Sequence, residues 1–181
     1  MKPADKRYIQ TWDKLEVFEQ EVASLLIQNI DLFKLLRCVE HDPLATDINE
    51  DEILDMITER LPNGKLNPSC RVMFEPFVYT SSTEIVSDLR IYPVAINPVN
   101  IYEGELHVCA DIIVHQDISK IVGGRRRNRI MSEVIKTLNG SRIKLVNRLF
   151  LTDKAIVLRQ FYGSYWGYTI LFKSGVSGGG K

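Results

Sequence analysis

The sequence predicts an α+β fold in which N-terminal helices pack on a largely antiparallel or mixed β-sheet, with one helix inserted between strands. Three observations lead to this prediction. Apolar side chains recur at helical spacing through the first sixty residues. Residues 105–115 instead alternate between apolar and polar side chains, which is the period of a strand with one buried face. A glycine–arginine turn and a second helical pattern follow, before further strand-like segments.

Length and composition describe one soluble domain. The chain has 181 residues, of which 45% are hydrophobic and 25% charged, as in ordinary globular proteins. We predict a single domain over residues 1–173, beginning with a polar leader at 1–10, and a flexible glycine- and serine-rich tail at 174–181. The 23 basic and 23 acidic residues give zero net charge. The chain therefore lacks the global field of a dedicated nucleic-acid binder, and no net repulsion opposes self-association.

A helical region is expected over residues 11–61. Its first helix has an apolar face that includes Trp12, Phe18, Val22 and Leu26. We expect the three helices to cover residues 11–30, residues 32–39 with Asp31 as the cap, and a stretch from the capping loop 46–51 to about residue 60.

The sheet is expected within residues 69–173. Its strands are predicted at residues 70–75, 84–92, 105–115, 142–151, 155–162 and 165–172, with the last two forming a closing hairpin. Pro93 and Pro98 predict an edge position or a loop for the residues between them, because proline cannot donate to a strand ladder.

The strand at residues 105–115 is the clearest local pattern. Five apolar side chains share one face: Leu106, Val108, Ala110, Ile112 and Val114. The other face carries Glu105, His107, Cys109, Asp111 and His115, with Ile113 as the one apolar exception. We interpret this second face as solvated or covered by another subunit. A metal site is not predicted, because ligands in one line cannot surround a tetrahedral ion without help from another element.

A basic turn opens the inserted helix, which is predicted over residues 125–139. Gly123 and Gly124 are followed by Arg125, Arg126, Arg127 and Arg129. A helix N-terminus disfavours cations by roughly a few tenths of a kcal/mol each, so helix stability does not explain four arginines. Either they face a partner, such as carboxylates of another subunit or a phosphate backbone, or their stems cover apolar surface while their charges stay solvated. We favour a partner-facing patch.

Aromatic side chains gather at the turn of the closing hairpin. Tyr162, Tyr165 and Trp166 lie within residues 161–168. Such side chains can stack nucleotide bases, or they can pack within a hairpin and at subunit contacts, where tyrosine and tryptophan are enriched. With zero net charge, packing or subunit contact is the better interpretation. We therefore predict an interface made by these aromatics and the four arginines.

Motifs for catalysis and cofactor binding are missing from the sequence. Cys38, Cys70 and Cys109 are widely spaced and form no CxxC pair, so a disulfide framework and a structural zinc site are not expected. Neither a phosphate-binding glycine motif nor a nucleophile motif occurs. We predict no cofactor, no metal and no enzyme activity. The alternative is a metal-dependent nuclease that uses Asp88, Glu105 and Asp111, or a small nucleic-acid-binding module.

Several short motifs carry a family resemblance. In order, these are Leu89-Arg90-Ile91-Tyr92, Asn100-Ile101-Tyr102, a strand ending Ile112-Ile113-Val114-His115, Gly124-Arg125-Arg126, and a helix ending Leu138-Asn139-Gly140. This order resembles the small tail-completion and neck proteins of tailed bacteriophages, which include tail terminators and the ring proteins between portal and tail. The resemblance covers residues 90–140 and extends loosely to residues 165–168.

The resemblance implies a structural subunit without catalytic residues. It implies a ring of six or twelve identical chains that seals the portal–tail junction around a DNA channel, with DNA passing through the lumen without sequence-specific binding. Portal or adaptor proteins and tail proteins would be its neighbours in the virion, and the host cytoplasm its place of synthesis. No signal region or membrane span is apparent in the sequence.

Overall fold

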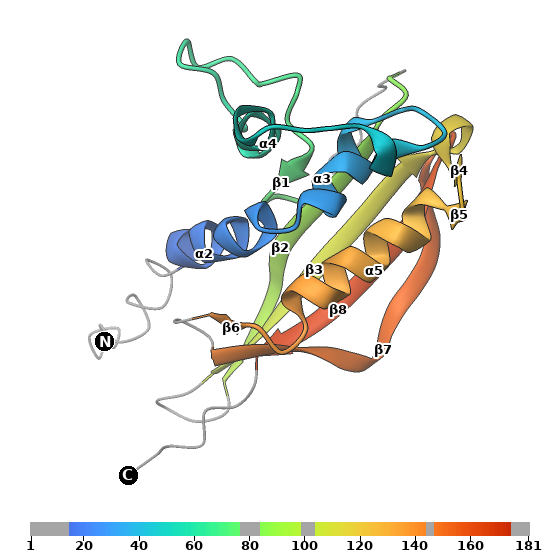
Figure 1. Ribbon diagram of the computed structural model, residues 1–181. Coiled ribbons are helices and arrows are strands. Elements are labelled where there is room, and N and C mark those ends of the chain that lie inside the picture. The colour runs from blue at the N-terminus through green and yellow to red at the C-terminus, as the bar shows by residue number, and fades with distance from the viewer. Residues whose placement is uncertain (1–14, 77–83, 99–103, 144–146, 175–181) are drawn as a thin grey trace.

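The computed structural model describes residues 15–76, 84–98, 104–143 and 147–174 (Figure 1). It confirms the α+β fold class. The predicted leader at 1–10 lies outside the described residues, as does the predicted tail except for Ser174, which ends the last strand and is buried. The described helices are α2 (Leu15–Ile27), α3 (Ile30–Arg37), α4 (Glu50–Ile57) and α5 (Arg126–Leu138), with short 3-10 helices η1 (Pro43–Ala45) and η2 (Gln116–Ile118).

One sheet of six strands organises the chain, in the order β1-β2-β3-β8-β7-β6. These strands are β1 (Val72–Met73), β2 (Ser87–Pro98), β3 (Gly104–His115), β6 (Arg142–Ile143), β7 (Asn147–Tyr162) and β8 (Tyr165–Ser174). Among the described strands, only β1 runs parallel to its neighbour β2, and the other pairs are antiparallel, so the sheet is mixed, as predicted. A separate hairpin of β4 (Lys120–Ile121) and β5 (Gly124–Arg125) precedes α5.

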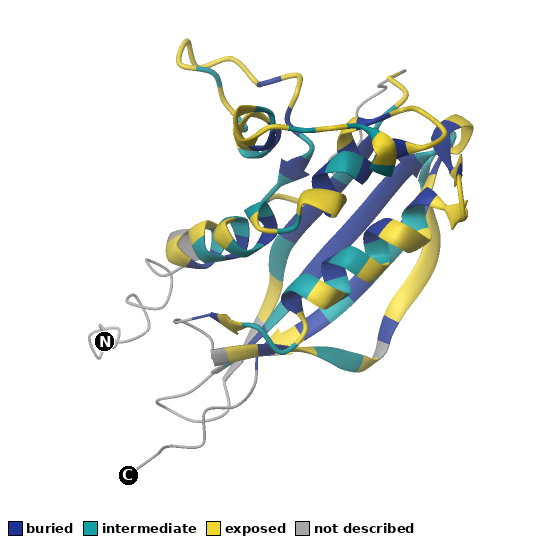
Figure 2. Cartoon of the chain, in the orientation of Figure 1, coloured by how far each residue is buried: buried dark blue, intermediate teal, exposed yellow. Residues whose placement is uncertain are grey.

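Helices α2, α3 and α5 lie on one face of the sheet, which curls around α5 (Figure 1). We call this the inner face. Strand β3 contributes its predicted apolar side chains to this core, and α5 buries Ile130, Val134 and Leu138 against them. Figure 2 shows the buried surface concentrated between these two layers. The helical stripe and the strand alternation therefore meet in one core, as their periods predicted.

The starts of α3 and α4 are fixed by asparagine side chains. The Asn29 side chain accepts a hydrogen bond from the Leu32 backbone N–H, and Asp31 lies in the first turn of α3, so the prediction of Asp31 as the cap is wrong. Asn49 caps α4 and forms a reciprocal pair with Glu52. Both arrangements satisfy N–H groups that a helix start leaves without an intrahelical partner.

Several strands differ in extent from the sequence prediction. Strand β1 keeps only two of the six residues expected at 70–75. Strand β2 continues through Pro93, with a shift in its pairing register between Pro93 and Ala95. The two strands predicted at 142–151 and 155–162 are instead the short β6 and one long β7, whose register against β8 shifts between Leu151 and Ile156. A bulge absorbs the polar residues that suggested a break.

Strand β3 is buried on both faces in its middle, which contradicts the prediction of a solvated polar face. Cys109, Asp111 and Ile113 are each at most 3% exposed. Asp111 accepts hydrogen bonds from the hydroxyls of Tyr92 on β2, at 2.8 Å, and Thr169 on β8, at 2.5 Å. Burial raises the pKa of the Cys109 thiol to about 11. Neighbouring strands therefore bury this polar row within one chain, without another subunit.

Gly167 lies where the backbone of the neighbouring central strand leaves no room for a side chain. A Cβ atom on Gly167 of β8 would lie 1.6 Å from the backbone oxygen of Ile112 on β3. Backbone atoms cannot move aside as the end of a flexible side chain can. The tight curl of the sheet at this point therefore requires a residue without a side chain.

Replacing Gly167 with alanine is expected to lower the free energy of unfolding by about 3 kcal/mol or more, because β3 and β8 must separate to admit the methyl group. Urea unfolding followed by circular dichroism measures the change. Lys173→Ala, at an exposed position of the same strand, is the control and is expected to stay within about 0.5 kcal/mol of the wild type. Equal midpoints for Gly167→Ala and the wild type would contradict the close approach.

Candidate interaction site

The residues predicted to make contacts lie at one end of the sheet. The basic segment folds as the β4–β5 hairpin and the first turn of α5, and we call residues 120–129 the arginine turn. The Gln116 backbone N–H bonds to the Ser164 carbonyl, which brings the end of β3 to the β7–β8 turn. Tyr168 of β8 donates to Asn128 in the arginine turn at 3.1 Å. The two predicted segments are therefore neighbours in the fold.

Arg126 is fully buried, so the prediction that it faces a partner is wrong. Its guanidinium donates to the carbonyls of Leu35 at 2.8 Å, Glu40 at 2.6 Å and Cys38, and its Nε donates to Ile118 at 2.9 Å. These acceptors include carbonyls at the C-terminal end of α3, where a cation is favoured by the helix dipole. Burial lowers the pKa of this guanidinium. Arg126 therefore joins α3 to the start of α5.

The other three arginines of the turn differ in exposure. Arg127 is half-buried, with its guanidinium carbon 6.0 Å from the centre of the Tyr168 ring. Arg125 and Arg129 are exposed. The Arg129 guanidinium lies back against Gly123, with a nitrogen 2.9 Å from where a Cβ atom would sit. A partner-facing role stays a prediction for these three, and Arg125 extends into solvent.

The three predicted aromatic residues separate between the two faces of the sheet. Tyr165 is 7% exposed, donates to the backbone carbonyl of Glu84, and meets the His115 ring edge-on at 5.0 Å. Tyr162 is half-buried beside it and lines the same cavity. Trp166 projects to the inner face, opposite Val114 in the ladder, and is 37% exposed. The aromatics therefore do not form one stacking surface.

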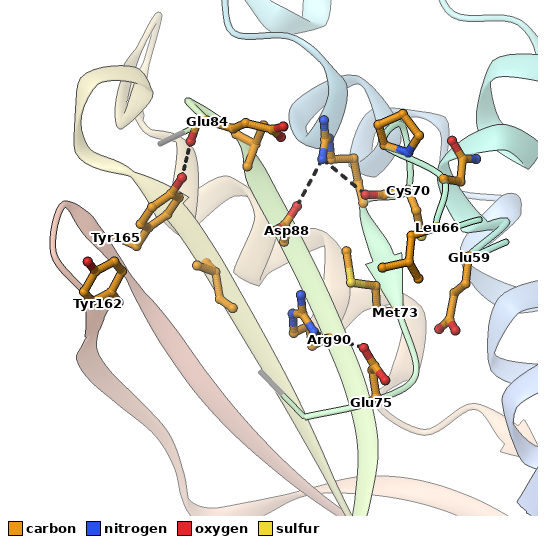
Figure 3. A pocket seen from close by; sticks show the side chains of 15 residues that line it. Glu59, Leu66, Cys70, Met73, Glu75, Glu84, Asp88, Arg90, Tyr162 and Tyr165 are labelled. Carbon is orange, nitrogen blue, oxygen red and sulfur yellow. Dashed lines mark hydrogen bonds and ion pairs between the residues drawn. The ribbon is translucent and has the colours of Figure 1, made fainter. Parts of the chain in front are cut away.

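A cavity of about 340 Å³ lies on the outer face of the sheet, away from α5. Four carboxylates line it, those of Glu59, Glu75, Glu84 and Asp88. Figure 3 shows Asp88 between the tyrosines of the closing hairpin on one side and Leu66 and Cys70 on the other. This outer cavity is at the lower end of the ~300–1,000 Å³ that is usual for ligand sites. It suits a group about the size of one long side chain.

The outer cavity is anionic. Four carboxylates and two arginines, Arg71 and Arg90, line the cavity, so the negative charges outnumber the positive ones. The Arg71 guanidinium is 3.7 Å from Asp88, and that of Arg90 is 3.8 Å from Glu75. Burial also raises the pKa of the Cys70 thiol to about 11. Cys38, Cys70 and Cys109 are all free and buried.

Asp88 is a largely buried carboxylate of the outer cavity, with its side chain 13% exposed. Its Oδ1 atom is buried and has no hydrogen-bond partner. Burial raises the pKa of Asp88 to about 6, the Arg71 and Arg90 charges oppose this rise, and Glu84 adds to it. From the sequence, Asp88 is predicted only as a possible metal ligand of the nuclease alternative. The alternation of Asp88 and Arg90 on one face of a strand was the signal that could have indicated a charged cavity.

Residues considered for metal binding are not gathered at one point. Glu105 bonds to His107 at 2.6 Å, whereas Asp111 is held by Tyr92 and Thr169. His115 accepts a hydrogen bond from the Asp117 backbone. Within the described ranges, no three side chains of histidine, cysteine, aspartate or glutamate are arranged to hold an ion.

Strand β7 presents an exposed apolar edge. Ile156, Val157 and Leu158 are 41%, 51% and 51% exposed, although they alternate between the two faces. Strand β6 pairs with β7 only at Asn147 and Arg148, so in the described part of the chain no strand pairs with the outward side of residues 156–160. We call these residues the β7 edge, and Figure 2 shows this part of β7 as exposed. Unpaired strand edges bind other strands.

Replacing Arg126 with methionine keeps an unbranched apolar side chain but removes every guanidinium donor. We expect the free energy of unfolding to fall by about 3 kcal/mol or more, because several buried carbonyls lose their partner. Urea unfolding measures this change. Arg125→Met, one residue earlier and exposed, is expected to stay within about 0.5 kcal/mol of the wild type. Equal losses in both variants would contradict the role of Arg126 in joining the helices.

The raised pKa of Asp88 predicts a stability change between pH 5 and pH 7. The folded-state pKa of about 6 lies above the ordinary aspartate value of 3.8, so the folded state holds a proton at pH 5 that the unfolded state has lost. The protonated Asp88 side chain therefore contributes to the stability of the folded state at pH 5. As the pH rises through 6 this contribution is lost, and the free energy of unfolding falls by about 1 kcal/mol.

The measurement compares urea unfolding of the wild type and Asp88→Asn at both pH values. The asparagine variant removes this titration, so the stability difference between the two proteins must change by about 1 kcal/mol between pH 5 and pH 7. A constant difference across this range would show that Asp88 titrates normally.

Comparisons with known proteins bear on the origin of the chain. No helix in the described residues is both long and apolar enough to cross a membrane. No curated protein matches the sequence. The model of the YomW family matches residues 29–174, which include every described element except α2. The name YomW comes from a phage-derived protein, which indicates a phage-related origin for the chain. The chain belongs to the YomW family.

Proposed function

We propose that this chain is a structural subunit of a phage neck or tail ring, which seals the portal–tail junction around the DNA channel. The observation that carries the proposal is the β7 edge, where three large apolar side chains flank an unpaired strand. Natural proteins usually blunt such edges with charges, prolines or a covering element. A second polypeptide bound along the β7 edge would remove this exposed surface.

A ring needs a second contact surface besides the β7 edge. Head-to-tail contacts close into a ring when the rotation from one chain to the next allows it. The exposed residues of the arginine turn, Arg125 and Arg129, lie at the end of the sheet and supply that second surface in our proposal. Zero net charge leaves no overall repulsion between copies.

The remaining details of the ring belong to the proposal. We infer six or twelve copies, with portal or adaptor proteins and tail proteins as neighbours in the virion and the host cytoplasm as the place of synthesis. DNA would pass through the lumen without sequence-specific contacts. The phage-related origin of the family supports this setting, while the copy number comes from the resemblance alone.

The nuclease alternative has less support from the ladder of β2 and β3. Asp88 pairs with Ile113, whereas Glu105 pairs with Asn97. Ile113, the residue opposite Asp88, lies eight positions along β3 from Glu105. At ~3.4 Å per residue, this separates the two carboxylates by roughly 27 Å. Two carboxylates that far apart cannot share an ion. Asp111 is buried under two hydroxyl donors, which favours a structural role.

A charge on the β7 edge is expected to prevent assembly without unfolding the chain. Light scattering across a concentration series should give a discrete hexamer or dodecamer for the wild type. For Val157→Lys it should give the 20.7 kDa chain, because an exposed lysine blocks strand pairing.

Val17→Lys is the control for this variant. It adds the same charge on α2, at a residue 41% exposed and away from the β7 edge, so assembly should persist. Circular dichroism melts verify that both variants fold. A wild type that is monomeric at every concentration removes self-assembly, and an assembled Val157→Lys removes the β7 edge from the interface.

A further inference from the structure

The outer cavity and the arginine turn carry complementary charges. Four carboxylates and two arginines line the cavity, while the arginine turn exposes Lys120, Arg125 and Arg129. The chain as a whole is neutral, yet carboxylates gather in the cavity and basic side chains on the arginine turn. Complementary surfaces on one chain steer copies into a defined orientation.

These two surfaces lie at the same end of the sheet but on opposite faces. Ile112 of β3 points into the core beneath α5, so the next residue, Ile113, points to the outer face. Asp88 pairs with Ile113 and therefore lies on the outer face as well. The arginine turn leads into α5, which covers the inner face. The sheet therefore separates the turn of a chain from its own cavity. Only the turn of another copy can meet this cavity.

The interior of the cavity has a carboxylate that still lacks a donor. The side chain of Asp88 is 13% exposed, and its Oδ1 has no hydrogen-bond partner, because Arg71 stands 3.7 Å away. A buried carboxylate oxygen without a donor is unfavourable. A guanidinium is the group best suited to supply one, because its planar donors match a carboxylate.

The walls of the cavity suit the rest of an arginine side chain. Tyr162 and Tyr165 form one side and Met73 contributes to the other (Figure 3). Aromatic faces stack with guanidinium groups, and the thioether accommodates methylene groups. Arg125 is exposed and forms no side-chain hydrogen bond or ion pair with any described residue. It is thus available to enter such a site.

We propose that the outer cavity receives the Arg125 side chain of a second copy of this chain, so that copies join head to tail. The inference rests on the proposed self-assembly and names the contact that gives it direction. Glu84, at the exposed rim, contributes charge that attracts the incoming turn. Asp88 lies deeper and receives the guanidinium. Each copy then offers one turn and one cavity, as a closed ring requires. Tyr162, at the end of β7, lines the cavity, so the cavity and the β7 edge belong to the same side of the contact.

Two complementary variants of the full chain test this contact by light scattering. A turn variant, Arg125→Glu with Arg129→Glu, keeps its cavity but loses the incoming cation. A cavity variant, Glu84→Gln with Asp88→Asn, keeps its turn but loses the acceptor. Each variant alone is expected to need at least about tenfold more protein than the wild type to assemble, because a partly buried charge pair is lost.

Mixing the two variants gives the decisive result. Only one productive contact is then possible, between the cavity of the turn variant and the turn of the cavity variant. An equimolar mixture is therefore expected to form a 1:1 heterodimer of twice the 20.7 kDa chain mass and to grow no further.

The possible negative results distinguish a wrong contact from a wrong ring proposal. If the wild type assembles and both variants assemble equally well, the contact is wrong and the ring proposal stands. If the mixture of variants forms no heterodimer although both are folded, the contact is likewise wrong. A wild type that stays monomeric at every concentration overturns the ring and this contact together. Should the cavity variant unfold, Glu84→Gln alone, on the exposed rim, replaces it in every arm.

Discussion

The buried guanidinium of Arg126 connects parts of the chain that are distant in sequence. It donates to carbonyls at the end of α3 and to the carbonyl of Ile118, which follows β3. The helix layer is thereby fixed to the sheet at the end where the arginine turn and the closing hairpin meet. Burying a cation without a carboxylate partner is unfavourable unless its donors are satisfied. Here the carbonyls of a helix C-terminus supply both the acceptors and a favourable dipole.

The curl of the sheet has consequences on both of its faces. It brings β8 so close to β3 that only glycine fits at Gly167. On the outer face, β2 and β8 flank the polar row around Asp111, which Tyr92 and Thr169 satisfy. Further along, the same curvature takes β7 away from α5, and the apolar side chains of the β7 edge remain exposed. Close strand pairing therefore satisfies the buried polar cluster, while the curvature of the sheet leaves part of β7 exposed.

The distribution of charge follows from this architecture. A neutral chain keeps carboxylates in the outer cavity and exposed arginines on the arginine turn, with the sheet between them. The raised pKa of Asp88 reflects a carboxylate buried with insufficient compensation. Structural stability alone does not call for such a group. The chain belongs to the YomW family, which indicates a phage-related origin, and we propose that the separated charges serve assembly.

The sequence by itself determined the fold class and the local elements whose side chains repeat with a clear period. The stripe of α5, the alternation of β3 and the closing hairpin were all predictable, because periodicity reports which face of an element is buried. Tertiary structure decided the rest. The four arginines look alike in sequence, yet one joins two helices while another reaches solvent. Likewise, Asp31 and Asn29 are both possible caps, and Cys70 and Asp88 share a cavity only because β1 pairs with β2. Such outcomes depend on contacts between residues far apart in the chain, and local patterns carry no information about those contacts.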